Sequence, residues 1–411
     1  MATTIPPAAH PSGNRILRWL TFSLFFLFAL TSESVGVIIP AVIAEFKIGM
    51  TVAGMFHYAT MAGIALGGVV LGSVIDRLGA KQGILIGLAA FGVSCALFAV
   101  THRFQAFVLL LFLGGLSIGL FKTAALAMIG NVAGTPREHT QTMNMAEGFF
   151  GIGAIVGPAI VALLLGAGYS WKWLYVIAAV ICFLVASMTL LVRFPARAAQ
   201  PVAQPTDHAA GSVRAMIALL RDPAVLGFAG AAILYVGVET AIYVWMPTLL
   251  TAHAGNWPLL SAYALSAFFI LRAAGRFVGA WLMGVLAWEQ VLMVSTGAIL
   301  LCFAGALFSP GHLAVFLLPL SGLFMSVVYP TINSKALSCF PASQHGSVAG
   351  IILFFTCLSA VVSPLAMGIM GDVSGDPLTG FALAGAFAVA LCAAAVANAI
   401  WKPVRMRLAH G

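Results

Sequence analysis

Long stretches without charge recur along the chain. Residues 82–100, 173–192 and 378–400 contain no Asp, Glu, Lys or Arg. Each stretch approaches the ~20 residues that a helix needs to cross about 30 Å of hydrocarbon. The whole pattern predicts twelve membrane-spanning helices, at 19–44, 52–75, 82–100, 105–131, 141–166, 173–193, 224–250, 258–285, 290–308, 313–338, 346–370 and 378–401.

The composition agrees with this pattern. Of the 411 residues, 62% are hydrophobic and 7% are charged, whereas an average soluble domain has about 25% charged residues. A soluble fold cannot cover its surface with so few charges, which excludes a single-domain soluble enzyme. We therefore predict an all-α polytopic membrane protein.

The basic residues predict the orientation of the chain. An even number of helices places both termini on one side of the membrane, and Lys and Arg concentrate on the cytoplasmic side. The side shared with the N-terminus carries Arg15, Arg18, Arg77, Lys81, Arg137, Arg193, Arg197, Arg214, Arg221, Lys402, Arg405 and Arg407, against Lys47, Arg103 and Lys172 opposite. We expect cytoplasmic termini in a bacterial inner (plasma) membrane. The net charge of +8 then reflects topology and indicates no nucleic-acid partner.

A polar linker divides the chain into two related halves. Residues 194–223 are rich in Pro, Ala, Gln and Arg and separate a predicted six-helix bundle at 1–193 from another at 224–411. An offset of about 206–207 aligns Glu33 with Glu239, Pro40 with Pro247, Gly68 and Gly72 with Gly275 and Gly279, and 115–123 with 322–331. Many secondary transporters are built from such repeats and hold their substrate near the midplane.

Two motifs carry a family resemblance. The sequence GSVIDRLGAK at 72–81 resembles the signature of the loop between the second and third helices in the major facilitator superfamily, and GFFGIGAIVGP at 148–158 resembles its glycine-rich fifth-helix motif. The resemblance implies two pseudo-symmetric six-helix bundles in one monomer. It also implies gating roles for residues in and beside these motifs, namely Asp76, Arg77, Gly79, Lys81, Glu147, Gly157 and Pro158.

A narrower resemblance lies in the second half. The segment 322–337 resembles the tenth helix of the fucose/galactose/glucose proton symporter family, and 235–239 and 275–279 are similar to its seventh and eighth helices. This implies secondary active transport of a small, polar, sugar-like solute by alternating access, with proton coupling. The chain departs from that family at Lys122, where a carboxylate is expected, and in having few Asn and Gln residues at depth.

Charged residues inside the predicted helices are candidates for function. Each costs at least about 2.5–3.5 kcal/mol in the bilayer core. They are Glu33, Lys122, Glu147, Glu239, Arg272, Arg276 and Lys335. None lies in the third, sixth, ninth or twelfth helix, which the superfamily resemblance places against lipid.

Opposite charges are available for pairing within each half. Glu33 can pair with Lys122, and Glu239 with Arg272. Both pairs can be permanent, or one can open when substrate or a proton arrives. Lysine can lose its proton when buried, whereas arginine stays charged, and the resembled symporters hold a coupling carboxylate in their first helix. We therefore assign proton coupling to Glu33 and Lys122.

Substrate binding is assigned to polar and aromatic residues near the second pair. Tyr235, Glu239 and Tyr243 recur at a spacing of four, which places them on one helical face, and Tyr329 lies one turn from Asn333. The predicted binding residues are Glu239, Arg272, Tyr235, Tyr243, Tyr329, Asn333 and Asn144. Ordinary interhelical packing explains any single tyrosine equally well.

Other functions remain as alternatives. Lys122, Arg272 and Lys335 favour an organic anion or zwitterion as substrate, and efflux of amphipathic compounds is a third possibility. The sequence has no paired histidines, no Ser/Lys arrangement and no GxxxxGK[ST] phosphate-binding loop. We expect neither enzymatic activity nor a metal or cofactor.

Overall fold

The computed structural model describes residues 11–70, 79–132, 135–192, 194, 219–253, 255–341, 344–402 and 404. The described residues form helices and no strands. Within this part of the chain, eleven helical segments are long and apolar enough to cross a membrane. The further span expected at 52–75 is described as far as Val70, in α4 (Met55–Val70). The predicted all-α polytopic architecture is confirmed.

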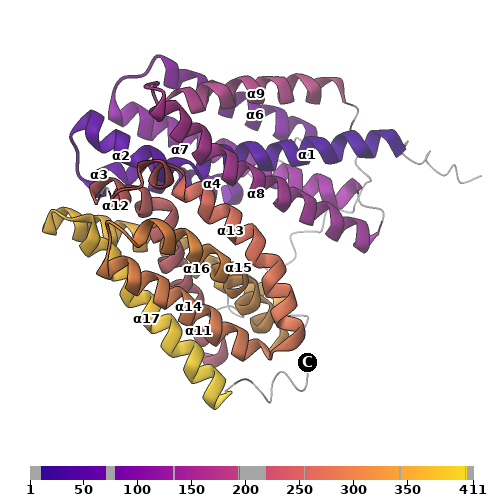
Figure 1. Cartoon of the computed structure of the whole chain (residues 1–411). Coiled ribbons are helices and arrows are strands. Elements are labelled where there is room, and N and C mark those ends of the chain that lie inside the picture. The colour runs from indigo at the N-terminus through magenta and orange to yellow at the C-terminus, as the bar shows by residue number, and fades with distance from the viewer. Residues whose placement is uncertain are drawn as a thin grey trace, which may run out of the picture. The chain divides into compact units, whose positions relative to one another are not determined.

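The contacts between helices define two compact units. The first combines Met1–Ser34 with Tyr58–Val202, and the second combines Val35–His57 with Ala203–Gly411. In the first unit α1 (Pro11–Ser32) packs along α8 (Pro136–Gly166), while α6 (Ala80–Ala96), extended by the 3₁₀ turn η1 (Leu97–Ala99), packs on α7 (Phe104–Val132) and α9 (Trp173–Leu191) (Figure 1).

The second unit holds the remaining helices. They are α2 (Val35–Phe46), α3 (Met50–Ala53), α11 (Pro223–Thr240), the π-helical segment η2 (Ala241–Trp245), α12 (Met246–Ala252), α13 (Pro258–Val285), α14 (Trp288–Phe308), α15 (Ala314–Ser338), α16 (His345–Ser374) and α17 (Pro377–Trp401). Helix α13 runs along α15, α14 packs on α15 and α17, and α11 packs on α16 (Figure 1).

The packing within each unit repeats at the predicted offset. Gly115 of α7 lies against the carbonyl of Thr60 in α4, and Gly322 of α15 lies against the carbonyl of Phe268 in α13. A Cβ at either glycine would overlap that backbone. Small residues at such crossings let membrane helices approach closely. The equivalence of 115–123 and 322–331 is therefore visible in three dimensions.

The glycine-rich motif of the fifth helix also serves packing. A Cβ at Gly157 in α8 would overlap the carbonyl of Leu30 in α1. At the equivalent crossing of the second unit, the Ser359 hydroxyl of α16 donates to the carbonyl of Ile233 in α11 at 2.8 Å. Both crossings thus use a small side chain to bring two backbones together.

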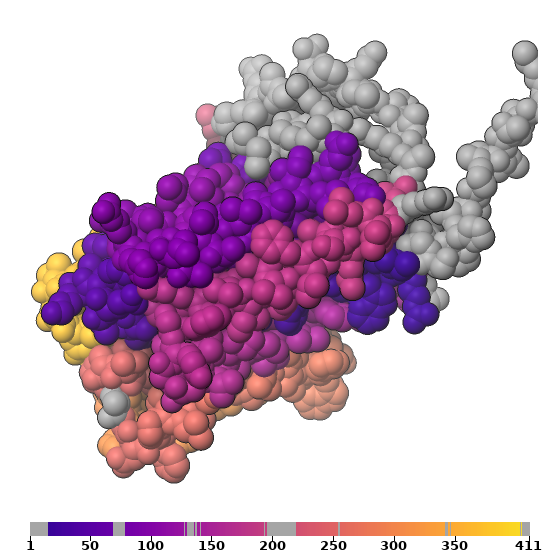
Figure 2. All heavy atoms as spheres, turned by 90° about the horizontal axis from the view of Figure 1, so that it is seen from above, coloured from indigo at the N-terminus to yellow at the C-terminus, as the bar shows by residue number. Residues whose placement is uncertain are grey.

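Helix α9 presents apolar side chains outward. Its exposed large hydrophobic residues are Trp173, Val180, Phe183, Leu184, Met188, Leu190 and Leu191. Figure 2 shows a face of the first unit that is coloured purple to magenta, the colours of the residue range from α6 to α9. Such a helix suits a lipid boundary, which is the position that the superfamily resemblance implies for the sixth helix.

The segment between the first two predicted helices packs differently from the expectation. The sequence predicts one helix over 19–44, whereas α1 ends at Ser32, a turn follows at Glu33 and Ser34, and α2 begins at Val35. Residues 35–57 pack within the second unit, where the Asp372 carboxylate accepts from the backbone N–H of Met50 at 2.6 Å and of Thr51 at 2.8 Å.

Four consecutive polar residues, 31–34, lie at this turn. The prediction of a single helix over 19–44 does not take them as a break. The predicted linker at 194–223 lies mostly outside the described residues. The division of the chain into functional halves at that linker stays a prediction.

Candidate functional site

The two aligned glutamates both lie where a helix is interrupted. Glu33 lies in the turn between α1 and α2, and Glu239 precedes the π-helical segment η2. Pro247 follows η2, and because its ring would collide with the carbonyl four residues earlier, a regular helix is disfavoured there. π-Helical insertions occur frequently at functional sites, and interrupted helices in transporters commonly border the substrate.

A buried polar network surrounds Glu239. The Arg272 guanidinium of α13 lies 2.5 Å from Glu239 Oε1. The Tyr235 hydroxyl donates to the same oxygen at 2.7 Å and lies 3.0 Å from the carbonyl of Met325 in α15. The Glu239 side chain is 11% exposed and that of Arg272 27%. The predicted pairing is confirmed, and three helices meet in it.

A pair of stacked tyrosine rings adjoins this network. The rings of Tyr235 and Tyr329 are stacked, with centroids 6.0 Å apart and planes 23° apart. Tyr235 is buried and Tyr329 half-buried. Stacked rings beside hydroxyl and charged groups offer both an apolar face and hydrogen-bonding partners to a small solute.

In the first unit, the Lys122 side chain lies beside two aromatic rings. The Lys122 ammonium of α7 lies 4.6 Å from the ring centroid of Phe28 and 5.7 Å from that of Phe25, both in α1. Such cation–π contacts stabilise a charge by about 0.5–2 kcal/mol, depending on desolvation. Glu33 is half-buried and accepts from the Ser32 hydroxyl at 3.2 Å. The pairing of Glu33 with Lys122 stays a prediction.

The other predicted binding residues lie in varied surroundings. The Tyr243 ring, within η2, lies 5.7 Å from the ring of His57, whose Nε2 is 3.1 Å from the carbonyl of Ala360. Asn333 of α15 is half-buried, and Asn144 of α8 is exposed. Their roles in binding stay predictions.

The predicted gating residues are described in part. Asp76 and Arg77 lie outside the described residues. Gly79 has φ of +88° and precedes α6, a backbone conformation that glycine adopts without strain. The Lys81 ammonium donates to the carbonyls of Leu190 at 3.1 Å and Val192 at 2.8 Å. Lys81 thus binds the C-terminal end of α9, where a helix dipole favours a cation.

The remaining gating candidates lie in α8. Gly157 and Pro158 are buried, and Glu147 is half-buried. A gating role for these residues is still a prediction. Among the described residues, no group of three or more His, Cys, Asp or Glu side chains could hold a metal ion.

Sequence reasoning missed three parts of this arrangement. They are the Met325 carbonyl, the rings of Phe25 and Phe28 around Lys122, and the π-helical segment. A carbonyl has no sequence signal, and phenylalanine is abundant in every membrane helix. Pro247, four residues after Tyr243, was the available signal for the π-helical segment.

Residues 21–364 match the model of the Major Facilitator Superfamily. The chain belongs to this superfamily. Its fold and its family therefore make it a membrane transporter. This also accounts for the interrupted helices and for charged residues buried at depth, both of which are frequent in transporters.

Individual relatives are more distant. The chain is 27% identical over 396 residues to the L-fucose-proton symporter of Escherichia coli K12, covering 87% of each. It is 23% identical to the glucose/galactose transporter of Brucella abortus, covering 91% of this chain and 94% of the relative. The solved structure of nucleoside transporter NupG matches with a TM-score of 0.73 at 18% identity, covering 94% and 98% of the two chains. That match concerns the fold alone.

Proposed function

We propose that this superfamily member moves a small, neutral, sugar-like solute across the membrane together with protons, by alternating access. The network around Glu239 carries the proposal. The charge of Arg272 is balanced by a carboxylate 2.5 Å away, and Tyr235 donates to that carboxylate. An anionic substrate would have to displace Glu239 from this pair, whereas a neutral polyol can use the network's polar atoms as they stand.

The stacked tyrosines support the same substrate class. Tyr329 is half-buried and stacks on the buried Tyr235, so it presents aromatic surface beside a hydroxyl group, which suits a solute with apolar C–H faces and polar edges. The names of two relatives, an L-fucose-proton symporter and a glucose/galactose transporter, agree with this reading.

Proton coupling is assigned to Glu33 with Lys122. Glu33 lies at the repeat position equivalent to Glu239 and beside a helix interruption. A carboxylate and an ammonium can each exchange a proton, whereas the guanidinium of Arg272 cannot. The pair in the first half therefore has two ways to change its charge.

The remaining assignments concern the setting of the protein. We place both termini in the cytoplasm of a bacterial cell, with the chain acting as a monomer in the inner membrane. The distribution of Lys and Arg supports the orientation. The internal repeat supports the monomer, because one chain supplies both halves of the transporter.

The test is a thermal-shift screen of purified protein at two pH values, with transport assays in proteoliposomes. A ligand that binds only the folded state raises the melting temperature. We expect one class of neutral sugars to raise it and to be accumulated under an inward proton gradient. Sugars that neither stabilise the protein nor accumulate, with stabilisation by carboxylates instead, would contradict the proposal.

An organic anion is the second candidate, and Lys122 is the observation that favours it. The resembled symporters have a carboxylate in the fourth helix, whereas this chain has a cation beside aromatic rings. If the substrate is an anion, Lys122→Met should abolish its binding. If it is a neutral sugar, Lys122→Met should disturb proton coupling and leave binding at equilibrium.

A further inference from the structure

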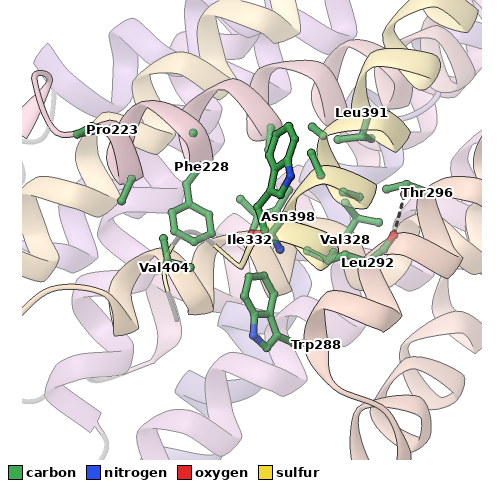
Figure 3. A pocket seen from close by; sticks show the side chains of 17 residues that line it. Pro223, Phe228, Trp288, Leu292, Thr296, Val328, Ile332, Leu391, Asn398 and Val404 are labelled. Carbon is green, nitrogen blue, oxygen red and sulfur yellow. Dashed lines mark hydrogen bonds between the residues drawn. The ribbon is translucent and has the colours of Figure 1, made fainter. Parts of the chain in front are cut away.

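A largely apolar cavity of about 560 Å³ lies within the second unit, between α11, α14, α15 and α17 (Figure 3). Its 17 lining residues include two polar ones, Thr296 and Asn398. The Thr296 hydroxyl donates to the carbonyl of Leu292 at 2.8 Å, so its proton is already used. The volume is within the range of ligand sites, about 300–1,000 Å³, but this lining does not suit a sugar.

The cavity lies at one end of the helix bundle. Pro223 begins α11, Trp288 begins α14, and Trp401 ends α17, and all three line the cavity. This is the end to which the linker leads and at which the C-terminal segment leaves the last helix. Tryptophan is enriched at membrane–water interfaces. The cavity therefore opens near the predicted cytoplasmic boundary of the bilayer.

A cation lies directly beyond one of these tryptophans. Trp288 also lines a neighbouring hollow of about 420 Å³, together with Ser334 and Lys335 of α15. The Lys335 ammonium lies 5.9 Å from the Trp288 ring centroid. The indole thus separates a space for an apolar chain from a space with a positive charge and a hydroxyl.

We propose that this pair of hollows binds an acidic phospholipid of the surrounding bilayer. One acyl chain occupies the cavity, and the phosphate group lies against Lys335 and Ser334. The acyl chain suits the cavity because nearly every lining group is apolar, and the charge of Lys335 complements an anionic headgroup. Basic pockets between helices on the cytoplasmic side bind anionic lipid headgroups in other membrane proteins.

The lipid site touches the helices that carry the solute site, on a different face of α15 and nearer the start of α11. Val328 and Ile332 of α15 line the cavity, while Tyr329 stacks on Tyr235 of α11. Phe228 of α11 lines the cavity as well, two turns before Tyr235. A bound acyl chain therefore supports α11 and α15 without entering the polar network.

The test uses Trp288 and Trp401 as internal reporters. Phospholipids with brominated acyl chains quench tryptophans that they contact, and phosphatidylglycerol is compared with phosphatidylcholine of the same chains in detergent solution. We expect saturable quenching by phosphatidylglycerol at about fivefold lower concentration, since one Lys near an anionic lipid contributes about that factor. Lys335→Gln should remove the difference in quenching between the two lipids, while the acyl chain still enters the cavity.

A matched pair of glycine variants tests whether the acyl chain lies in the cavity. Gly227 lines the cavity, and a Cβ there meets open space. Gly230, one turn further along α11, also has open space around a Cβ but does not line the cavity. Gly227→Leu should abolish the saturable quenching, and Gly230→Leu should retain it.

Two results would overturn the proposal. One is equal quenching by both lipids in the unsubstituted protein, and the other is unchanged quenching in Gly227→Leu. If Gly227→Leu fails to fold, the double substitution Trp288→Phe with Trp401→Phe replaces it. That variant should lose the phosphatidylglycerol-dependent quenching while its other tryptophans still fluoresce, and retention of the quenching would place the lipid elsewhere.

Discussion

Glu33 and Glu239 occupy equivalent positions of the repeat but have different surroundings. Glu239 is held by Arg272 at 2.5 Å and by the Tyr235 hydroxyl at 2.7 Å. Glu33 lies in a turn and accepts a hydrogen bond from its neighbour Ser32. Lys122, the cation predicted to pair with it, lies over aromatic rings. The repeat therefore conserves the place of a carboxylate while changing what surrounds it.

This difference separates two tasks. A carboxylate fixed by a permanently charged guanidinium and a phenol is suited to orient a solute, because its geometry is maintained by several bonds. A carboxylate in a turn, with a cation that can itself release a proton, is suited to change charge during the cycle. If the halves divide the work in this way, substitutions in the first half should impair coupling and those in the second half should impair binding.

The largest effect is expected at Glu33. Glu33→Gln keeps the size of the side chain and can still bond to Ser32, but it cannot exchange a proton. We expect complete loss of proton-driven accumulation in proteoliposomes, with counterflow of labelled solute down its own gradient retained. Accumulation by Glu33→Gln under a proton gradient would show that the coupling group lies elsewhere. In Glu239→Gln, by contrast, counterflow should be lost as well.

The next effect concerns the ion pair of the second half. Arg272→Ala leaves the buried carboxylate of Glu239 without its guanidinium, and such a loss destabilises proteins by about 3–5 kcal/mol. We expect a value near the lower end because the Arg272 side chain is 27% exposed. The measurements are the melting temperature and solute affinity at equilibrium.

The matched control for this change lies one turn away. Arg276 is on the same helix, α13, and is exposed. Arg276→Ala should leave both stability and affinity close to those of the unsubstituted protein. Equal losses from the two substitutions would mean that the charge of α13, rather than the Glu239 pair, determines binding.

A smaller effect is expected from removing the Tyr235 hydroxyl. Tyr235→Phe keeps the stack on Tyr329 and removes one hydrogen bond to a charged group, which contributes about 1.5–3 kcal/mol. We expect weaker solute binding, with proton-driven accumulation retained at high solute concentration. Tyr329→Phe keeps the same ring stack and the hydrogen bond of Tyr235 to Glu239, so it separates the loss of that bond from the loss of a tyrosine hydroxyl at the site. Loss of coupling in Tyr235→Phe would contradict the division of tasks.

The sequence predicted the fold and the pairing of the second half well. Spans follow directly from uncharged stretches, and Glu239 with Arg272 had opposite charges in neighbouring helices at similar depth. The break at Glu33 and the packing of residues 35–57 in the second unit were not foreseen. The break falls on the polar residues 31–34, which the prediction of one continuous helix passed over. The packing of 35–57 depends on tertiary contacts, such as that of Asp372 with the N–H groups of Met50 and Thr51, and a hydrophobic pattern does not register these.

The smallest predicted effect concerns the rings around Lys122. Phe28→Leu retains an apolar side chain but removes the nearer ring, 4.6 Å from the ammonium, and a cation–π contact contributes about 0.5–2 kcal/mol. Because that contact favours the charged ammonium, its loss should shift the pH dependence of accumulation while leaving counterflow intact. Phe22→Leu is the matched control, since Phe22 is as buried in α1 and stacks on Phe149 instead. A pH profile that moves equally in both variants would mean that packing of α1, and not the charge of Lys122, sets the pH dependence of the first half.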